Sequence, residues 1–383
     1  MTLNKLFLDP IRELARQGKL TGVMLIAATV LSLLLSNGER AGTWLGLWDT
    51  EIGFSFLHKS ILHWINDGLM VIFFLLVGLE IKREMTGGEL ATVRQAILPA
   101  FAALGGILFP AAIYAVLHVG SPETLQGWAI PTATDIAFSL GILSLLGKRV
   151  PFALKVFLTA LAIIDDLGAI LIIAIFYTSA IHLVMLLAGA IIFIIMLAFN
   201  RFGLKHLAFY LVPGLLLWYF ILKSGVHPTI AGVLTAFAIP SSSAEDLEHG
   251  LTRPVNYMIL PLFALANTAI PLSFDLGNQI FSPLSLGIIL GLFLGKPAGI
   301  LLFSYLPRWL NISEGPSGFT FKHILGMGFT AGIGFTMSIF ISSLSFEHPN
   351  DANLSKLAII AGSVLAATAG LVILSRSPKT ESE

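Results

Sequence analysis

Twelve apolar segments recur along the chain, and no other feature of the sequence restricts its fold as strongly. A helix that crosses a bilayer needs about 20 mostly apolar residues. In lipid only helices and closed barrels satisfy every backbone hydrogen-bonding group, and runs of this length fit helices. We therefore predict an all-α polytopic membrane protein with 12 transmembrane helices, near residues 20–36, 61–81, 96–117, 124–146, 152–177, 183–200, 207–222, 226–240, 254–272, 284–305, 322–346 and 355–375.

The composition supports this class of protein. Hydrophobic residues make up 56% of the 383 residues and charged residues only 11%, whereas soluble domains carry about 25% charged residues. The formal net charge is zero, so nothing in the charge favours nucleic acid as a partner. The chain has no cysteine, which excludes disulfides and thiolate metal sites. We expect no cofactor and a surface that lies in membrane lipid.

Lysine and arginine are distributed unevenly between the predicted loops. If the N-terminus is inside, the cytoplasmic segments hold 17 of the 22 basic residues and the outside loops hold 4, while Lys296 falls within the tenth span. Cytoplasmic loops are enriched in Lys and Arg. The distribution predicts an even number of spans with both termini cytoplasmic.

The longest outside loop, about 37–60, contains the string GLWDTEIGFSFLHKS. Aromatic and aliphatic residues partly alternate with polar ones, and Gly53 allows a turn. We predict a short extracellular β-hairpin over 47–60. Because an isolated hairpin is marginally stable in water, pairing with a second subunit would explain its order. An interfacial loop with aromatic anchors is the alternative.

Two adjacent acids, Asp165 and Asp166, lie inside the apolar fifth span. Charge at the bilayer centre costs roughly 3 kcal/mol on insertion scales, so such residues indicate function. Neighbouring carboxylates titrate as a coupled unit. When ionised, they offer the hard oxygen ligands that small hard cations prefer. The pair can therefore hold protons or a cation in competition. The alternative is that one acid pairs with Lys296 and the other caps a kink. Asp67 and Glu80 lie toward opposite ends of span two, where snorkelling or local hydration is a sufficient explanation.

Two spans carry residues that interrupt helices. Span four reads GWAIPTATDIAFSLGIL, in which Pro131 precedes Thr134 and Asp135. Span eleven reads GMGFTAGIGFTMSIF, whose glycines permit either unwinding or close packing. The two spans are the middle members of helices 3–5 and 10–12. Interrupted segments at corresponding places indicate inverted repeats around a transport site. We predict such repeats, with broken helices 4 and 11.

Asp135 and Lys296 are candidates to offset the dipoles of the half-helices. Lys296 is equally suited to pair with Asp165 and to give way when a cation binds. The sequence does not choose between dipole compensation and a switching salt bridge.

Seven strings taken in order resemble the bacterial NhaA sodium/proton antiporters. They are FLLVGLEIKRE, GWAIPTATDIAFSLG, ALAIIDDLGAI, LKSGVH, ILPLFALAN, GKPAGI and GIGFTMSIF, and the resemblance covers the chain from the first span to the last. It implies an electrogenic, pH-regulated antiporter of the bacterial inner membrane that expels Na⁺ or Li⁺ in exchange for protons by alternating access.

The resemblance also implies roles for residues and regions. The cation and proton ligands would be Asp165 and Asp166, with Thr134, Asp135 and Lys296 supporting the site. The family is dimeric through its extracellular hairpin, so we expect a homodimer. Residues 1–383 would form a single transporter unit with a core bundle at about 96–177 and 284–376 and an interface bundle at about 20–81 and 183–272.

The resemblance further implies a cytoplasmic cluster that answers to pH, made of Glu80, Arg83, Glu84, Glu248, His249 and, elsewhere in the chain, His227. Around this cluster the chain departs from the family pattern. Glu245 and Asp246 stand where a basic pair usually precedes the LEH stretch, and Thr252 replaces a second histidine. The acidic residues should alter local titration. His249 is also explained as a solvated loop histidine, and His227 as a helix cap beside Pro228.

Two other transport functions compete with Na⁺(Li⁺)/H⁺ exchange. A cation channel usually gathers its charged ring from several subunits, whereas these acids gather within one predicted bundle. A sodium-coupled symporter of an organic anion would need a larger polar cavity than the few polar groups in the spans suggest. An enzyme is disfavoured because no metal-ligand spacing such as HExxH appears.

Overall fold

The structure is a computed structural model that describes residues 20–55, 57–178, 180–273, 277, 279–312 and 319–377, apart from the side chain of Lys148. The chain forms two compact units. The first comprises Met1–Ala27, Thr92–Ala169 and Leu272–Glu383, and the second comprises Ala28–Ala91 and Ile170–Pro271. The predicted cytoplasmic segment 1–19 and residues 378–383 lie outside the described residues. Two helices contribute to both units, α2 (Leu20–Ser36) and α9 (Phe152–Phe176).

The first unit is built from helices whose described elements follow the order of the chain. They are α6 (Val93–Leu117), α7 (Pro122–Leu125), η3 (Gln126–Thr132), α8 (Ile136–Leu145), η4 (Gly147–Arg149), η6 (Gln279–Phe281), α16 (Pro283–Leu290), η7 (Gly291–Gly295), α17 (Lys296–Trp309), α18 (Phe321–Ala331), α19 (Phe335–Ser345) and α20 (Pro349–Ser375).

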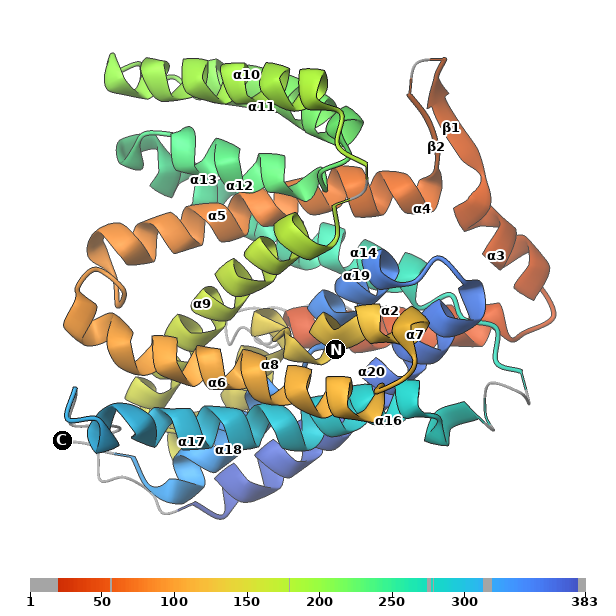
Figure 1. Ribbon diagram of the computed structural model, residues 1–383, viewed down its shortest axis with the longest axis vertical. Coiled ribbons are helices and arrows are strands. Elements are labelled where there is room, and N and C mark those ends of the chain that lie inside the picture. The colour runs from red at the N-terminus through yellow and green to blue at the C-terminus, as the bar shows by residue number, and fades with distance from the viewer. Residues whose placement is uncertain are drawn as a thin grey trace, which may run out of the picture. The chain divides into compact units, whose positions relative to one another are not determined.

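Glycines bring two helices of this unit into backbone contact. Helices α6 and α17 run side by side (Figure 1). A Cβ atom on Gly105 would lie 2.2 Å from the carbonyl oxygen of Gly299, and one on Gly299 would lie 2.0 Å from that of Gly105. Small residues permit such close approach in membrane helices. A buried core that includes Leu154, Ile300 and Met327 fills the neighbouring space.

The second unit contains further helices and one pair of strands. They are α3 (Ala41–Asp49), β1 (Glu51–Phe54), β2 (Leu57–Ser60), α4 (Ile61–His63), η2 (Trp64–Leu69), α5 (Met70–Gly87), α10 (Leu183–Arg201), α11 (Ala208–Ser224), α12 (Thr229–Ala238), α13 (Ser241–Pro254), η5 (Val255–Ile259) and α14 (Leu260–Asn267).

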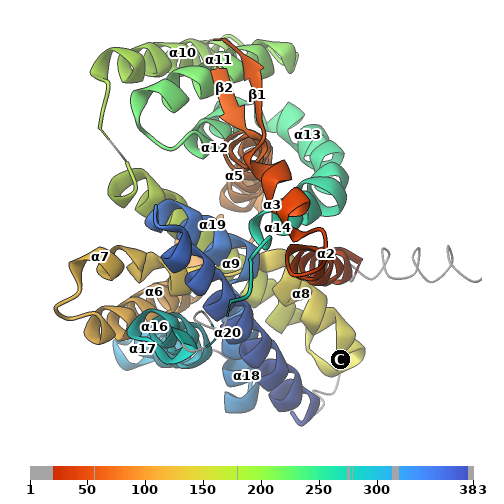
Figure 2. The same ribbon diagram turned by 90° about the vertical axis from the view of Figure 1, so that its right-hand side faces the viewer.

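Strands β1 and β2 pair antiparallel, with Glu51 opposite Ser60 and Phe54 opposite Leu57 (Figure 2). The strands occupy a shorter range than 47–60, because residues up to Asp49 are helical. In α3 the rings of Trp44 and Trp48 meet edge to face at 5.1 Å, a contact that i, i+4 spacing on a helix provides.

Six described helices are long and apolar enough to cross a membrane. Three bent pairs bring the number to nine if each pair is one span. Helices α11 and α12 are apolar but shorter, at 17 and 10 residues. The chain is therefore a mainly helical membrane protein, and the count of twelve spans stays a prediction. The six long helices are Ile61–Gly87, Val93–Leu117, Phe152–Phe176, Leu183–Arg201, Pro283–Trp309 and Pro349–Ser375.

Candidate ion-binding site

Span four is broken at the position that Pro131 predicts. The 3₁₀-helix η3 ends at Thr132, Ala133 is extended, and α8 begins at Ile136, with a bend of 45° between the two halves. Asp135 is the N-cap of α8, where its Oδ1 accepts a hydrogen bond from the backbone N–H of Phe138 at 2.9 Å. Aspartate is a preferred N-cap because it satisfies an N–H that has no partner within the helix.

Span eleven is broken in the same way. Helix α18 ends at Ala331 and α19 begins at Phe335, again with a bend of 45°. The glycines at 332 and 334 lie in the break. The structure contains both explanations that the sequence left open: the helix is unwound at Gly332 and Gly334, and close packing occurs within α18. There a Cβ on Gly326 would lie 2.6 Å from Leu374, and one on Gly328 would lie 3.0 Å from Pro297.

The two breaks face each other. The backbone N–H of Asp135 donates to the carbonyl of Ile333 at 2.7 Å. The hydroxyl of Thr134 donates to the carbonyl of Ala331 at 2.9 Å. Thr134 and Asp135 are 0% and 2% exposed. Residues almost 200 positions apart in sequence therefore form one buried crossing, in which irregular backbone is paired as an apolar environment requires.

Asp135 lies between two helix N-termini. Besides capping α8, its Oδ2 accepts from the backbone N–H of Thr336 at 3.1 Å and from the Thr336 hydroxyl at 2.6 Å. Thr336 belongs to the first turn of α19. The N-terminal end of a helix carries positive potential, so one carboxylate offsets two such ends.

Lys296 lies at the opposite kind of helix end. Its Nζ donates to the carbonyl of Thr132, the last residue of η3, and to Asp165 Oδ2 at 2.7 Å. The ammonium is fully buried. The sequence left dipole compensation and a salt bridge as alternatives for Lys296, and in this structure the same ammonium makes both contacts.

The two aspartates of α9 are each 2% exposed. Asp165 uses one oxygen for Lys296, and within the described part of the chain its Oδ1 accepts no hydrogen bond. Asp166 is the next residue of the same helix. The first unit thus brings three buried acids, Asp135, Asp165 and Asp166, together with one buried lysine. Carboxylate oxygens in this setting can take a proton or a small hard cation.

Thr336 was present in the string GIGFTMSIF but was not singled out as a site residue. A threonine in an apolar helix usually bonds back to its own turn, and its sequence context gave no sign of Asp135 as partner. The pairing depends on the crossing of two distant spans. Only an expected match between the two breaks would have suggested that the first turn of α19 faces Asp135.

A second cluster joins α5 to α13 within the second unit. Arg83 Nη1 bonds to Glu248 Oε1, and Arg83 Nη2 bonds to Glu84 Oε1 at 2.9 Å. Glu80 lies within electrostatic reach of Arg83 and Glu248. The Glu248 side chain is 6% exposed while that of Arg83 is 47% exposed. The structure therefore brings together four of the six residues predicted to answer to pH.

Burial raises the pKa of Glu248 above its ordinary value, and this is the largest influence on the group. The positive charge of Arg83 opposes the shift, and His249 opposes it less. The negative charges of Glu84 and Glu245 add to it. Glu245 is one of the acids that depart from the family pattern, so the departure acts directly on the titration of Glu248.

The two histidines lie differently from this cluster. His249 Nε2 is 4.0 Å from Glu245 Oε1, and both side chains are more than 70% exposed, so their attraction is weak. His227 is buried at the start of α12, where its Nδ1 lies 2.7 Å from the Thr229 hydroxyl. Its Nε2 lies 3.7 Å from Asp67 Oδ1. His227 thus lies beside Asp67 of η2, which precedes α5 in the chain.

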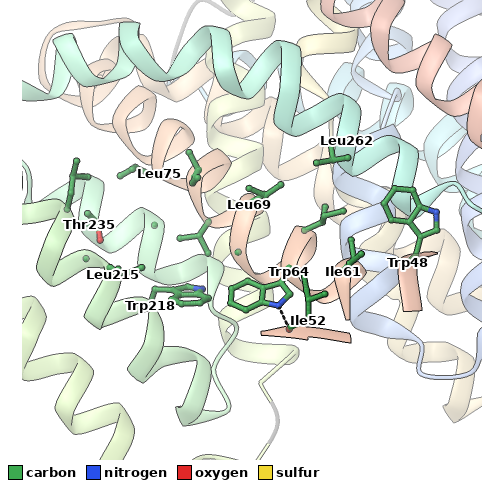
Figure 3. A pocket seen from close by; sticks show the side chains of 17 residues that line it. Trp48, Ile52, Ile61, Trp64, Leu69, Leu75, Leu215, Trp218, Thr235 and Leu262 are labelled. Atoms are coloured by element: carbon green, nitrogen blue, oxygen red, sulfur yellow. Dashed lines mark hydrogen bonds between the residues drawn. The ribbon is translucent and has the colours of Figure 1, made fainter. Parts of the chain in front are cut away.

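An apolar cavity of about 630 Å³ lies elsewhere in the second unit. Figure 3 shows Trp48, Trp64 and Trp218 around it, with Trp64 Nε1 donating to the carbonyl of Ile52 at 3.0 Å. Its lining within the described residues contains no Asp, Glu, Lys or Arg. Such a cavity suits neither a bare cation nor an organic anion, since it offers no opposite charge.

Comparisons with known proteins agree with one another. The profile of the family described as Na⁺/H⁺ antiporter 1 matches residues 12–374. The chain is 50% identical to the Na⁺/H⁺ antiporter NhaA 2 of Flavobacterium johnsoniae over 375 residues, which cover 94% of this chain and 91% of the relative. It is 50% identical to the Na⁺/H⁺ antiporter NhaA of a Shewanella species (strain ANA-3), over 96% of this chain and 97% of the relative. The NhaA protein of Shewanella loihica is 47% identical over the same shares.

Proposed function

The chain belongs to the Na⁺/H⁺ antiporter 1 family, and from that premise we propose that it exchanges Na⁺ or Li⁺ for protons at Asp165 and Asp166. Na⁺/H⁺ antiport by a multi-pass protein of the bacterial inner membrane is supported by the NhaA relatives over nearly the whole chain. The protein is thus a secondary active transporter and not an enzyme.

One observation carries the assignment of the site: the buried contact of 2.7 Å between Lys296 and Asp165 beside the crossing of two broken helices. Buried charges persist in lipid where they are paired or serve transport. Asp165 and Lys296 neutralise each other, whereas the adjacent Asp166 adds a second carboxyl group at the same place. A site of this kind holds a proton or a cation without needing a permanent net charge.

We propose that the cation competes with both Lys296 and the protons. A Na⁺ ion that binds the oxygens of Asp165 and Asp166 takes over the role of the ammonium in neutralising Asp165. The lysine keeps its bond to the Thr132 carbonyl, so the helix end remains compensated when the salt bridge opens. Return of protons to the carboxylates then releases the cation, and alternating access makes the cycle an exchange.

Everted membrane vesicles test the assignment. A pH gradient imposed by respiration should collapse when Na⁺ or Li⁺ is added, and Asp166→Asn should abolish the response. Asp165→Asn should impair it strongly. Asp49→Asn changes an exposed acid and serves as the control, with an unchanged response. If both site variants keep full exchange, the carboxylates are not the ligands.

The rival transport functions are separated by the direction of flux. An antiporter moves Na⁺ against its own gradient when a proton gradient is supplied, whereas a channel only dissipates the Na⁺ gradient. A symporter would need an organic anion for Na⁺ flux. The apolar lining of the second-unit cavity does not favour an anion site.

We further propose twelve spans with both termini in the cytoplasm. Support comes from the distribution of basic residues and from the two shorter apolar helices, α11 and α12, which bring the count to eleven when each bent pair is one span. The twelfth would be the predicted span 254–272, where η5 and α14 lie. The core bundle would hold the ion site and the interface bundle would carry the hairpin. Fusion of a reporter enzyme at each loop tests this topology.

We propose that the Arg83–Glu248 cluster, with Glu80, Glu84 and His249, regulates exchange by pH, and that His227 adds a separate contribution. The raised pKa of Glu248 supports this role because it moves titration toward the range of cytoplasmic pH. Rates measured across pH with Glu248→Gln test it: the variant should show a flatter pH profile with the same maximal rate.

A further inference from the structure

Two serines lie at the same position, the fourth residue, in the two half-helices that follow the breaks. Ser139 is the fourth residue of α8, which starts at Ile136, and Ser338 is the fourth residue of α19, which starts at Phe335. Both side chains are 0% exposed. Neither belongs to the set of residues that the transport mechanism has used so far.

Each serine reaches across to the other broken span. The Ser139 hydroxyl donates to the carbonyl of Thr330 in the last turn of α18 at 2.7 Å. The Ser338 hydroxyl donates to the carbonyl of Ile130 near the end of η3, also at 2.7 Å. Carbonyls in the last turn of a helix lack a partner within the helix. Each serine therefore donates to a carbonyl near the end of a half-helix of the other broken span, in a reciprocal arrangement. The Thr330 carbonyl also accepts from the backbone N–H of Ile333 at 3.2 Å.

The surroundings are shaped for these contacts. A Cβ on Gly334 would lie 2.1 Å from the Ser338 oxygen, so only glycine leaves room for the hydroxyl there. The ordinary alternative for a serine in a helix is to bond to a carbonyl of its own preceding turn. Ser304 does so in α17, where its hydroxyl donates to the carbonyl of Ile300 at 2.6 Å.

We propose that Ser139 and Ser338 are a matched pair of positioning residues that hold the two broken spans in register and thereby set the affinity for the cation. The inference rests on the proposed site at Asp165 and Asp166. Ile130 lies two residues before Thr132, whose carbonyl binds Lys296. Thr330 lies one residue before Ala331, whose carbonyl binds Thr134.

A loosened crossing would therefore move the hydrogen-bond partners of Lys296 and Thr134 without removing any charge. Binding sites need their groups held to within about 0.5 Å, so affinity should suffer first. Loss of one buried hydrogen bond corresponds to about a fivefold change in an equilibrium constant. The maximal rate depends on the carboxylates and should stay within about twofold.

Substitution pairs that differ only in the hydroxyl give the sharpest test. Threonine and valine have the same shape, so Ser338→Thr and Ser338→Val are compared with each other, as are Ser139→Thr and Ser139→Val. Na⁺-dependent exchange is measured in everted vesicles at one fixed pH, giving KM and maximal rate separately. Ser304→Ala is the control for loss of a buried hydroxyl that bonds within its own helix.

The expected result is a KM for Na⁺ about fivefold higher in each valine variant than in its threonine partner, with unchanged maximal rates. Ser304→Ala should keep the KM of the unaltered protein. The double valine variant should raise KM by less than the product of the two single effects, because both ties hold one crossing. Equal KM values for the valine and threonine variants, at both positions, would overturn the proposal.

Two further outcomes are assigned in advance. If the valine variants lower only the melting temperature, to the same extent as Ser304→Ala, the serines are structural and the proposal is wrong. If Ser338→Ala does not fold, the test still rests on Ser338→Thr and Ser338→Val. These two variants fill the same volume and differ only in the hydroxyl group, so their KM values for Na⁺ still support or overturn the proposal. Retention of exchange by Asp166→Asn would instead contradict the proposed ion site, irrespective of the serine results.

Discussion

At the scale of single residues, the site depends on how one buried lysine is shared. Lys296 bonds both to the end of η3 and to Asp165, so its ammonium keeps one hydrogen-bond acceptor if the salt bridge opens. Asp135 does the corresponding work at the N-termini of α8 and α19. Under the proposed mechanism, dipole compensation and ion exchange would therefore be separable roles of one ammonium.

This arrangement predicts the stability of variants at Lys296. Lys296→Met leaves the buried carboxylate of Asp165 without its cation, and breaking a buried pair from one side costs about 3–5 kcal/mol. Adding Asp165→Asn removes the stranded charge, so the double variant should recover most of the loss. Thermal unfolding of the purified protein in detergent measures both steps.

The control for this series is Lys59→Met, which removes an exposed lysine from β2 and should leave the melting temperature unchanged. A double variant that is no more stable than Lys296→Met alone would mean that Lys296 stabilises the fold through Thr132 and not through Asp165.

At the scale of elements, the end of α12 is held by donors from two other helices. Lys82 of α5 bonds to the carbonyl of Ile239 and, at 3.0 Å, to that of Phe237. Asn200 of α10 donates to the carbonyl of Ala238 at 2.7 Å. Three successive carbonyls at a helix C-terminus are thus satisfied, two of them by a cation.

Lys82→Met should therefore destabilise the second unit by about 1.5–3 kcal/mol, the usual contribution of a hydrogen bond from a charged group. Methionine keeps the length and the apolar stem of the side chain, so packing is preserved. Hydrogen exchange followed by mass spectrometry should show faster exchange at the end of α12 and the start of α13. The control Lys205→Met should leave exchange in these peptides unchanged, because only the backbone carbonyl of Lys205 bonds to Ser243 there. If hydrogen exchange in Lys82→Met is unchanged, the bond from Asn200 is sufficient to hold the end of α12.

Helix α13 carries the acidic departure from the family pattern, and its effect has a definite sign. Glu245 raises the pKa of Glu248 by charge repulsion. Glu245→Gln removes the repulsion, so the pKa of Glu248 falls and its proton leaves at lower pH. If exchange is activated as Glu248 loses its proton, the pH of half-activation shifts downward. The measurement is the Na⁺-dependent response of everted vesicles across pH.

Asp246→Asn is the matched control, since Asp246 is exposed on the next position and is not among the influences on Glu248. If the pH of half-activation shifts equally in Glu245→Gln and Asp246→Asn, the cause is the lower negative charge of the surface and not the repulsion between Glu245 and Glu248. The raised pKa of Glu248 also affects the stability of the fold. Because folding raises this pKa, protonated Glu248 stabilises the folded protein at pH values below its unfolded pKa. This contribution is lost as the pH rises through the folded pKa. Glu248→Gln should therefore unfold with less dependence on pH.

At the scale of the whole molecule, the sequence was sufficient for the class of protein and for the family. Apolar runs long enough for membrane helices are visible in the sequence itself. Membership in the NhaA family, which the seven strings predicted, is confirmed. The two breaks were predicted from Pro131 and the glycines of span eleven, because those residues act on their own backbone. The choice of partners was not predictable. Thr336 for Asp135 and the two contacts of Lys296 depend on which distant segments cross, and local patterns do not encode this.

The hairpin gives the last prediction, at the level of assembly. Strand β1 is exposed along its length, with Ile52 and Phe54 at 47% and 70% exposure. Its outer edge has no partner strand among the described residues, and an exposed edge with apolar side chains readily pairs with another chain. In a two-fold dimer both copies of β1 would be covered. Phe54→Glu should weaken the dimer about tenfold or more, because an aromatic side chain that the dimer would bury is replaced by a charge.

Native mass spectrometry across a dilution series measures this effect. Phe281→Glu changes a phenylalanine that is 78% exposed in η6, and it should dimerise like the unaltered protein. The residues of the proposed ion site, Asp135, Asp165, Asp166 and Lys296, all belong to the first unit of one chain. Exchange by Phe54→Glu in vesicles should therefore continue at an unchanged KM. A dimer as tight as that of Phe281→Glu would place the contact elsewhere, and loss of exchange on dissociation would mean that the partner subunit supports the transport cycle.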